Sequence, residues 1–257
     1  MSMQYFDNRF VGGDKNPPFL PFFHCCDAFY LQNIIKDRHL KPRPCKVFNN
    51  EELLYLFYGR PAYKSSEVQN SKMASFMPTC FILKPGAVAE IRRILPFDSG
   101  GFSLYKECMH PGMTLESFLM TPSLESISKT IGYFYKGNQE YLLAKPNESI
   151  VYDPLEFQVE SYHTLISGKF LTNADDRKAS IEVQVNQPIP LTKDSLDAVI
   201  LPSYLMSSQT VQDFFINELD TTVITIENFG VASSRYYIHL LEKVQEFLTK
   251  KYLLNVN

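Results

Sequence analysis

Short strand-like and helix-like segments follow one another irregularly along this chain, and their order constrains the fold more than any other feature. β-branched, aromatic or alternating residues predict strands over residues 22–24, 79–83, 179–185, 198–202 and 222–227. Apolar residues spaced three and four apart predict helices over residues 28–40, 51–58, 115–120, 124–135, 211–219 and 235–252. Residues 138–143 and 158–166 fit a strand or a loop. Because helices do not regularly separate the strands, we predict an α+β fold rather than a doubly wound sheet.

The length and continuity of the chain favour one domain. Its 257 residues can bury a substantial core, and 45% hydrophobic with 14% aromatic residues is typical of a globular protein. No Gly/Ser-rich or charged linker divides the chain, and no internal repeat recurs along it. We therefore predict a single domain over residues 1–257, with an elaborated middle at about residues 100–173.

Charge and hydropathy narrow the choice of partners. The formal net charge is −3 and the pI is about 6.0, so no overall positive field attracts nucleic acid, which leaves only a local basic groove for that purpose. The longest apolar runs are far shorter than the roughly 20 residues of a membrane helix. Residues 1–10 lack both the basic start and the apolar stretch of a secretory signal. We expect a cytoplasmic protein without a membrane partner.

The five cysteines do not have the spacing of a zinc site. Only Cys25 and Cys26 are close in sequence, whereas zinc modules use pairs separated by about two to four residues. An adjacent pair is compatible with metal ligation or redox chemistry, but reduced and partly buried thiols are the more common state in the cytosol. We therefore predict no metal site.

Three separated motifs contain the side chains best suited to chemistry. They are His24 at the end of the first predicted strand, Arg60 in a Gly-Arg-Pro turn, and Glu182 at the end of residues 176–182. Each also has a structural interpretation: a strand-end histidine, a surface arginine after a helix stop, and an outward-facing glutamate. Residues 54–63 place three tyrosines around Arg60, a composition suited to binding a nucleotide with phosphates.

Alternation along residues 179–185 separates two faces of the predicted strand. One face carries Ser180, Glu182 and Gln184, and the other carries only small or apolar residues. The polar face presents a carboxylate between a hydroxyl and an amide, which suits a cleft as well as it suits solvent. We expect the apolar face to point into the core and the polar face to point into a cleft.

Together these motifs resemble the DarT-type ADP-ribosyltransferases. Residues 23–27 (Phe-His-Cys-Cys-Asp), followed by a helix that ends at His39-Leu40, are similar to the family's first strand and helix. Arg60 and the strand at residues 78–82 are similar to the catalytic arginine and the strand after it, and residues 177–191 are similar to the glutamate strand. The resemblance implies an ART-like fold, with a central split sheet of mixed or antiparallel strands and peripheral helices.

The same resemblance implies that the chain cleaves NAD⁺ as its substrate and transfers ADP-ribose. Glu182 would be the catalytic carboxylate, which stabilises the positive charge that develops on the ribose as nicotinamide leaves. Arg60 would hold the pyrophosphate or position the acceptor, and His24 would anchor the nicotinamide half. The other expected NAD⁺ contacts are Asp27 and a tyrosine stacked on the nicotinamide ring, either Tyr58 or Tyr63.

The acceptor and the cellular role are implied only by the resemblance. The resemblance implies that the acceptor is a DNA base or a protein. It also implies that the chain is a toxin or a phage-defence effector with an antitoxin or another regulatory partner. Residues 98–102 (Asp-Ser-Gly-Gly-Phe) form either a surface turn or a loop whose Phe102 stacks on a base or covers the NAD⁺. The alternatives are an NAD⁺ glycohydrolase of the same fold, which turns over without an acceptor, and a non-enzymatic binding module, which does not bind NAD⁺.

Overall fold

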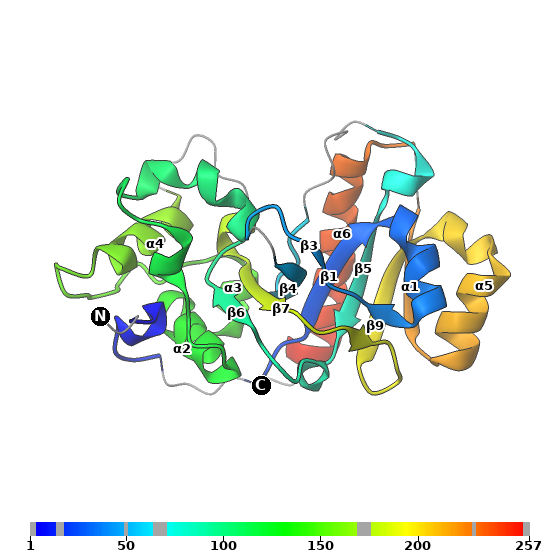
Figure 1. The fold of residues 1–257 in the computed structure, drawn as a ribbon, viewed down its shortest axis with the longest axis horizontal. Helices are drawn as coiled ribbons and strands as arrows, with labels where there is room; N and C mark the ends of the chain where they lie inside the picture. The colour runs from blue at the N-terminus through cyan, green and yellow to red at the C-terminus, as the bar shows by residue number, and fades with distance from the viewer. Residues whose placement is uncertain are drawn as a thin grey trace.

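The computed structural model describes residues 4–13, 18–48, 51–63, 71–168, 176–227 and 230–253. These residues form a mixed α/β structure around one large sheet whose strands run in both directions (Figure 1). This architecture agrees with the predicted α+β class. Within these ranges, no helix is both long enough and apolar enough to cross a membrane.

The large sheet is mostly antiparallel. Its strands are β1 (Phe22–Asp27), β3 (Arg43–Pro44), β4 (Glu52–Tyr58), β5 (Pro78–Leu83), β6 (Arg93–Leu95), β7 (Ile181–Val185), β9 (Leu196–Pro202) and β10 (Thr222–Ile226). The strand order is β10-β9-β5-β1-β4-β7-β6, with β3 paired to β4. Only β9 and β10 are paired in parallel. A second, two-stranded sheet joins β2 (His39–Leu40) to β8 (Ile189–Pro190).

Helices cover both faces of the large sheet. They are α1 (Leu31–Asp37), α2 (Leu124–Tyr135), α3 (Asn138–Leu142), α4 (Phe157–Ser167), α5 (Gln209–Gln212) and α6 (Ser233–Leu248). The helix α6 lies behind β1 and β5 (Figure 1), where Leu240 and Val244 pack against Phe23 and Ile200. The opposite face belongs to a larger core that includes the apolar side chains of α2 and α4. The strands β5, β7 and β9 are therefore buried along their full length.

The central strands β1 and β4 separate after a short contact. They pair only at Phe22 with Tyr58 and at Phe23 with Phe57. Beyond this point β1 stays paired with β5 along its full length, from Phe22 to Asp27. Meanwhile β4 stays paired with β7. The sheet is therefore open between two central strands, and this opening positions the site described below.

The segment over residues 51–58 is a strand, and the helix predicted there is wrong. Its leucines and aromatic residues fit a helix by periodicity, but a short apolar run of this length fits a buried strand equally well. Pairing with both β1 and β7 decides the outcome, because a strand in the middle of a sheet buries side chains on both faces. Gly59, expected to stop the helix, ends the strand instead and turns the chain with a φ of 67°.

Two segments that fitted a strand or a loop are helices. Residues 157–167 form α4, whose buried residues Val159, Tyr162 and Ile166 recur at spacings of three and four. The helix ends at Gly168 in the left-handed conformation. The segment from residue 138 forms the short helix α3. Packing against the core, rather than a strong local pattern, selects the helical state of both segments.

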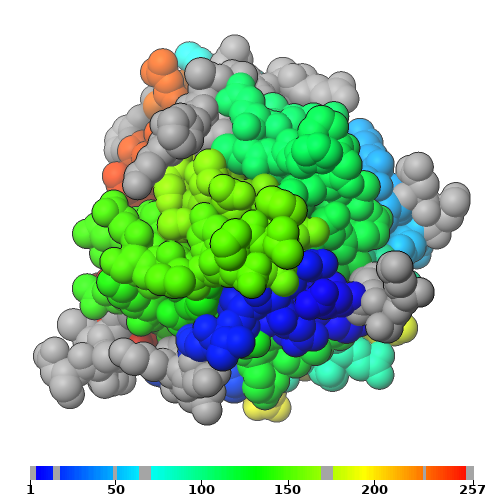
Figure 2. All heavy atoms as spheres, turned by 90° about the vertical axis from the view of Figure 1, so that its left-hand side faces the viewer, coloured from blue at the N-terminus to red at the C-terminus, as the bar shows by residue number. Residues whose placement is uncertain are grey.

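The N-terminal segment is part of the core. Phe6 lies against Phe134 of α2 with a centroid distance of 5.9 Å, and Phe10 stacks on Tyr133 at 4.4 Å. The backbone N–H of Phe6 donates to the carbonyl oxygen of Leu119 at 2.7 Å. Figure 2 shows this segment, in blue, lying between the green helical segments on one side of the molecule. Phe6 and Phe10 therefore belong to the same core as the apolar side chains of α2 and α4.

Candidate functional site

A pocket of about 370 Å³ lies where β1 and β4 part. Its walls come from β1, β3, β4, the segment after β4, and the loop after β6. The charged and hydrogen-bonding side chains of its lining, apart from two cysteines, are His24, Asp27, Tyr30, Lys41, Arg43, Tyr55, Tyr63 and Asp98. A volume of this size is in the lower part of the range for small-molecule sites, about 300–1,000 Å³. The pocket therefore suits a polar small molecule or one half of a larger one.

His24 is a neutral hydrogen-bonding group in the pocket wall. Its Nδ1 lies 2.9 Å from the carbonyl oxygen of Tyr55. A carbonyl oxygen only accepts, so Nδ1 carries the proton and Nε2 keeps its lone pair. Burial lowers the pKa of His24 to about 4, and the nearby charge of Arg43 acts in the same direction. At neutral pH the ring therefore offers an acceptor nitrogen rather than a positive charge.

The open end of β1 brings a carboxyl group, aromatic rings and a cation together. The Tyr63 hydroxyl donates to Oδ1 of Asp27, and the guanidinium of Arg43 lies 3.5 Å from the centre of the Tyr30 ring. Burial raises the pKa of Asp27, against the lowering effect of the Tyr63 hydrogen bond and of Arg43. Asp27 stands at the N-terminus of the helical turn that follows β1, but its side chain makes no capping hydrogen bond there. It faces Tyr63 instead.

Asp98 reaches the pocket from the loop after β6. Its Oδ2 accepts from Nη1 of Arg177 at 3.0 Å, and its Oδ1 accepts from the backbone N–H of Gly100 at 2.8 Å. The backbone N–H of Asp98 also donates to the carbonyl oxygen of Arg177 at 3.2 Å. Both side chains are buried. These contacts fix the orientation of the carboxylate at the pocket wall.

Glu182 lies on β7 opposite Phe57 of β4 and is fully buried. Its Oε2 accepts from the backbone N–H of Ser99 at 2.9 Å and from Oγ of Ser99 at 3.0 Å, and its Oε1 accepts from Nε2 of Gln184 at 2.5 Å. Burial, with a further contribution from the charge of Asp98, raises the pKa of Glu182 to about 8. The carboxyl group is therefore mostly protonated at neutral pH.

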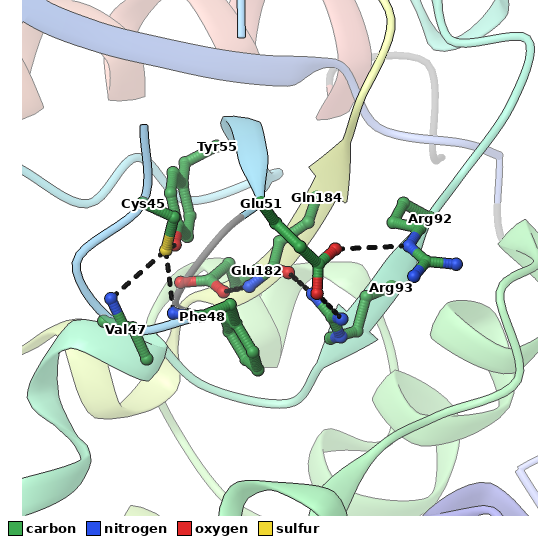
Figure 3. A network of polar contacts seen from close by, with 9 residues as sticks. All are labelled: Cys45, Val47, Phe48, Glu51, Tyr55, Arg92, Arg93, Glu182 and Gln184. Carbon is green, nitrogen blue, oxygen red and sulfur yellow. Dashed lines mark hydrogen bonds and ion pairs between the residues drawn. The ribbon is translucent and has the colours of Figure 1, made fainter. Parts of the chain in front are cut away.

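A chain of polar contacts connects Glu182 to the protein surface (Figure 3). Oε1 of Gln184 accepts from Nη1 of Arg93, and Nη2 of Arg93 donates to Oε1 of Glu51 at 2.8 Å. Nε of Arg92 lies 3.3 Å from the other carboxylate oxygen of Glu51. The amide of Gln184 is thus held on both sides. The predicted alternation of polar and apolar faces is present on β7, but protein groups close the polar face.

The structure separates the expected site residues into two groups. His24, Asp27 and Tyr63 line the pocket, whereas Tyr58, Arg60 and Glu182 do not. The Tyr58 hydroxyl accepts from the backbone N–H of Leu20 in the core. Nη1 of Arg60 donates to the carbonyl oxygen of Leu142, and the partners of Glu182 are those given above. Of the three side chains expected to act together on NAD⁺, only His24 lines this pocket, and Arg60 and Glu182 lie outside its lining.

Sequence reasoning missed five polar residues of the pocket: Tyr30, Lys41, Arg43, Tyr55 and Asp98. Tyr55 belongs to the tyrosine-rich segment, and a strand there would have placed it on the face opposite Tyr58. Asp98 begins the glycine-containing loop whose Phe102 was expected to stack on a base or cover the NAD⁺, if the loop is not a surface turn. The Phe102 ring packs on Phe97 in the core, with centroids 5.9 Å apart. Arg43 follows a proline in an extended segment and has no distinguishing signal.

No protein-family model matches this chain, and no curated protein matches it. Within the described ranges, no group of three or more His, Cys, Asp and Glu side chains is arranged to hold a metal ion. The pocket itself offers a neutral imidazole, tyrosine rings, two carboxyl groups and the cations Lys41 and Arg43. This combination can bind a ligand that has an aromatic ring, hydroxyl groups and phosphates.

Proposed function

We propose that this chain is an NAD⁺-dependent ADP-ribosyltransferase whose site is the pocket between β1 and β4. The observation that carries the proposal is the polar pocket in the opening of the central sheet, with His24 on one wall and Asp98 on another. A split central sheet is what the resemblance to DarT-type ADP-ribosyltransferases implies. The position of His24, Asp27 and Tyr63 in this pocket supports the same interpretation.

The groups in the pocket match the parts of NAD⁺. The rings of Tyr30 and Tyr63 suit stacking on nicotinamide, and Nε2 of His24 suits a ribose hydroxyl. Lys41 and Arg43 are exposed at the rim, where their charges suit the pyrophosphate. The pocket then holds the nicotinamide and its ribose, and the rest of the molecule lies along the rim.

The reaction breaks the bond between C1′ of the ribose and N1 of nicotinamide. The electron pair stays on N1, so nicotinamide leaves as a neutral molecule and positive charge develops on the ribose. The carboxylates of the pocket lining supply the negative charge that stabilises this transition state. A nucleophilic atom of the acceptor then bonds to C1′, and its proton passes to a carboxylate of the pocket or to water.

Nicotinamide release tests the proposal directly. The purified protein is incubated with NAD⁺ alone and with DNA, RNA or cell protein, and nicotinamide is measured by chromatography. We expect release that depends on one macromolecular class, together with ADP-ribose on that class by mass spectrometry. Release without any acceptor would make the protein a glycohydrolase. Failure to bind NAD⁺ at millimolar concentration would make it a non-enzymatic binding module.

A matched pair of arginine variants locates the NAD⁺. Arg43→Gln removes a cation of the pocket, and Arg60→Gln removes a cation outside it. A charged hydrogen bond contributes about 1.5–3 kcal/mol, so we expect Arg43→Gln to weaken NAD⁺ binding by roughly 10- to 100-fold in calorimetry. Arg60→Gln should leave the Kd within about threefold, with folding of both variants checked by circular dichroism. The reverse result would place NAD⁺ at Arg60 and remove it from this pocket.

A further inference from the structure

Two carboxyl groups lie beside the pocket, and they differ in access to it. Asp98 lines the pocket and is 8% exposed, whereas Glu182 is 0% exposed. Both oxygens of each carboxyl group accept hydrogen bonds from the protein, so contact with the pocket is what distinguishes Asp98 from Glu182. We propose that Asp98 is the catalytic carboxylate that contacts the substrate, and that Glu182 is a positioning residue that acts through Ser99. This inference rests on the proposed transferase function. It assigns a different role to each of the two carboxyl groups.

The contacts of Glu182 explain how it positions Asp98. Ser99 follows Asp98 directly, and Glu182 binds both the backbone N–H and the hydroxyl of Ser99. The loop is thereby tied to β7 at the residue next to Asp98. On its other side the carboxylate of Asp98 is tied to Arg177. A carboxylate held at both ends keeps the orientation that charge stabilisation in a transition state requires.

The surroundings of Asp98 place the reacting ribose near it. Tyr55 lines the pocket together with Asp98, and its carbonyl oxygen lies 2.9 Å from Nδ1 of His24. The other carboxyl group of the lining, Asp27, lies at the open end of β1 and faces the Tyr63 hydroxyl. Asp98 and His24 line the same pocket, so a ribose that binds Nε2 of His24 shares that pocket with Asp98.

The charge of the pair also favours Asp98. Burial and the charge of Asp98 raise the pKa of Glu182, so Glu182 is mostly neutral at neutral pH, whereas Asp98 forms an ion pair with the guanidinium of Arg177. The other groups that face Glu182 are Ser99, the amide of Gln184 with Arg93 behind it, and Tyr55. The pKa of Tyr55 is itself raised, so its hydroxyl stays protonated when Glu182 ionises.

Steady-state kinetics with NAD⁺ and the identified acceptor separate the two roles. Asp98→Asn should lower kcat by at least about 100-fold with little change in the KM for NAD⁺, because the lost charge acts only in the transition state. Glu182→Gln should lower kcat by only about tenfold at pH 7. The loss is smaller because the substitution replaces a mostly neutral group with a neutral one. Asp194→Asn, an exposed carboxylate outside the pocket, is the control for removal of a charge and should keep the wild-type kcat.

The pH profile provides a readout that a merely structural role would not change. Wild-type kcat should show a transition near pH 8, where Glu182 ionises and a second negative charge appears beside Asp98. Glu182→Gln should lack this transition. A kcat within tenfold of wild type for Asp98→Asn, or equal losses in the Asp98→Asn and Glu182→Gln variants, would overturn the division of roles. Absence of nicotinamide release from wild type would instead overturn the proposed function.

A second variant protects the test against misfolding. Asp98→Asn removes the carboxylate that pairs with the buried guanidinium of Arg177 at 3.0 Å, and removal of one partner of a buried ion pair is strongly destabilising. The double variant Asp98→Asn/Arg177→Gln removes both charges of the pair. It should fold by circular dichroism and show the same loss of kcat. A folded double variant with near wild-type kcat would refute a catalytic role for Asp98.

Discussion

Substitution of Glu182 by Gln should change how the stability of the protein depends on pH. The folded state raises the pKa of this carboxyl group from 4.5 to about 8, mainly through burial. In the unfolded chain the group ionises near its ordinary value. Between about pH 4.5 and pH 8 the folded state therefore holds a proton that the unfolded state has lost. The free energy of unfolding contributed by Glu182 is fully present below pH 4.5 and is lost as the pH rises towards 8.

The expected magnitude follows from the two pKa values of Glu182. Each pKa unit corresponds to about 1.36 kcal/mol, so the wild-type protein should lose roughly 3–4 kcal/mol from this residue between pH 5 and pH 8. For a chain of about this size, 1 kcal/mol corresponds to about 2–4 °C in Tm. Gln has nearly the same shape and does not titrate. Glu182→Gln should therefore lack this part of the pH dependence.

Chemical unfolding followed by circular dichroism at pH 5 and pH 8 measures this effect. The quantity of interest is the stability of Glu182→Gln minus that of wild type, in which all other titrating groups cancel. We expect this difference to increase by roughly 3–4 kcal/mol from pH 5 to pH 8. A difference that stays constant with pH would show that Glu182 ionises in the folded protein as it does in the unfolded chain. The buried, protonated state inferred here would then be wrong.

Three further predictions concern the core and the pocket. His24→Gln should reduce the loss of stability on acidification from about pH 6.5 to pH 4, because the folded state lowers the pKa of His24 to about 4 and the unfolded chain takes up the proton first. Gly132→Ala should lower Tm, since a Cβ there would lie 2.3 Å from the backbone oxygen of Gly13, whereas Gly86→Ala, with open space, should not. Ile181→Ala, at a fully buried position, should cost roughly 2–5 kcal/mol in urea unfolding.

Local patterns in the sequence were sufficient for much of the fold. The helix predicted over residues 124–135 has the bounds of α2, and the strand predicted over residues 222–227 is β10 with one residue fewer. These segments have strong periodicity and clear ends, such as the Ser123 side chain that accepts from the N–H of Ser126. The failure at β4 has a different cause. Its state depends on pairing with β1 and β7, which lie far away in sequence.

The same error explains most of the misplaced site residues. A helix over residues 51–58 would place Tyr55 and Tyr58 on one side. In the strand they point to opposite faces. Tyr55 enters the pocket, and Tyr58 enters the core. Arg60 then follows the turn at Gly59, at the end of β4 where β1 and β4 are still paired, rather than where they part.

Glu182 shows that a sequence motif can identify a residue without predicting whether a ligand can reach it. Alternation placed Glu182 on the polar face of β7. The residues that cover this face, Ser99 and Arg93, lie about 80 to 90 residues earlier in the chain. A buried carboxyl group with a polar network contributes less to stability than apolar residues that fill the same space. Stability alone therefore gives no reason for a glutamate at this position. A requirement to hold the loop that carries Asp98 does give one, and it accounts for the contact of Glu182 with both donors of Ser99.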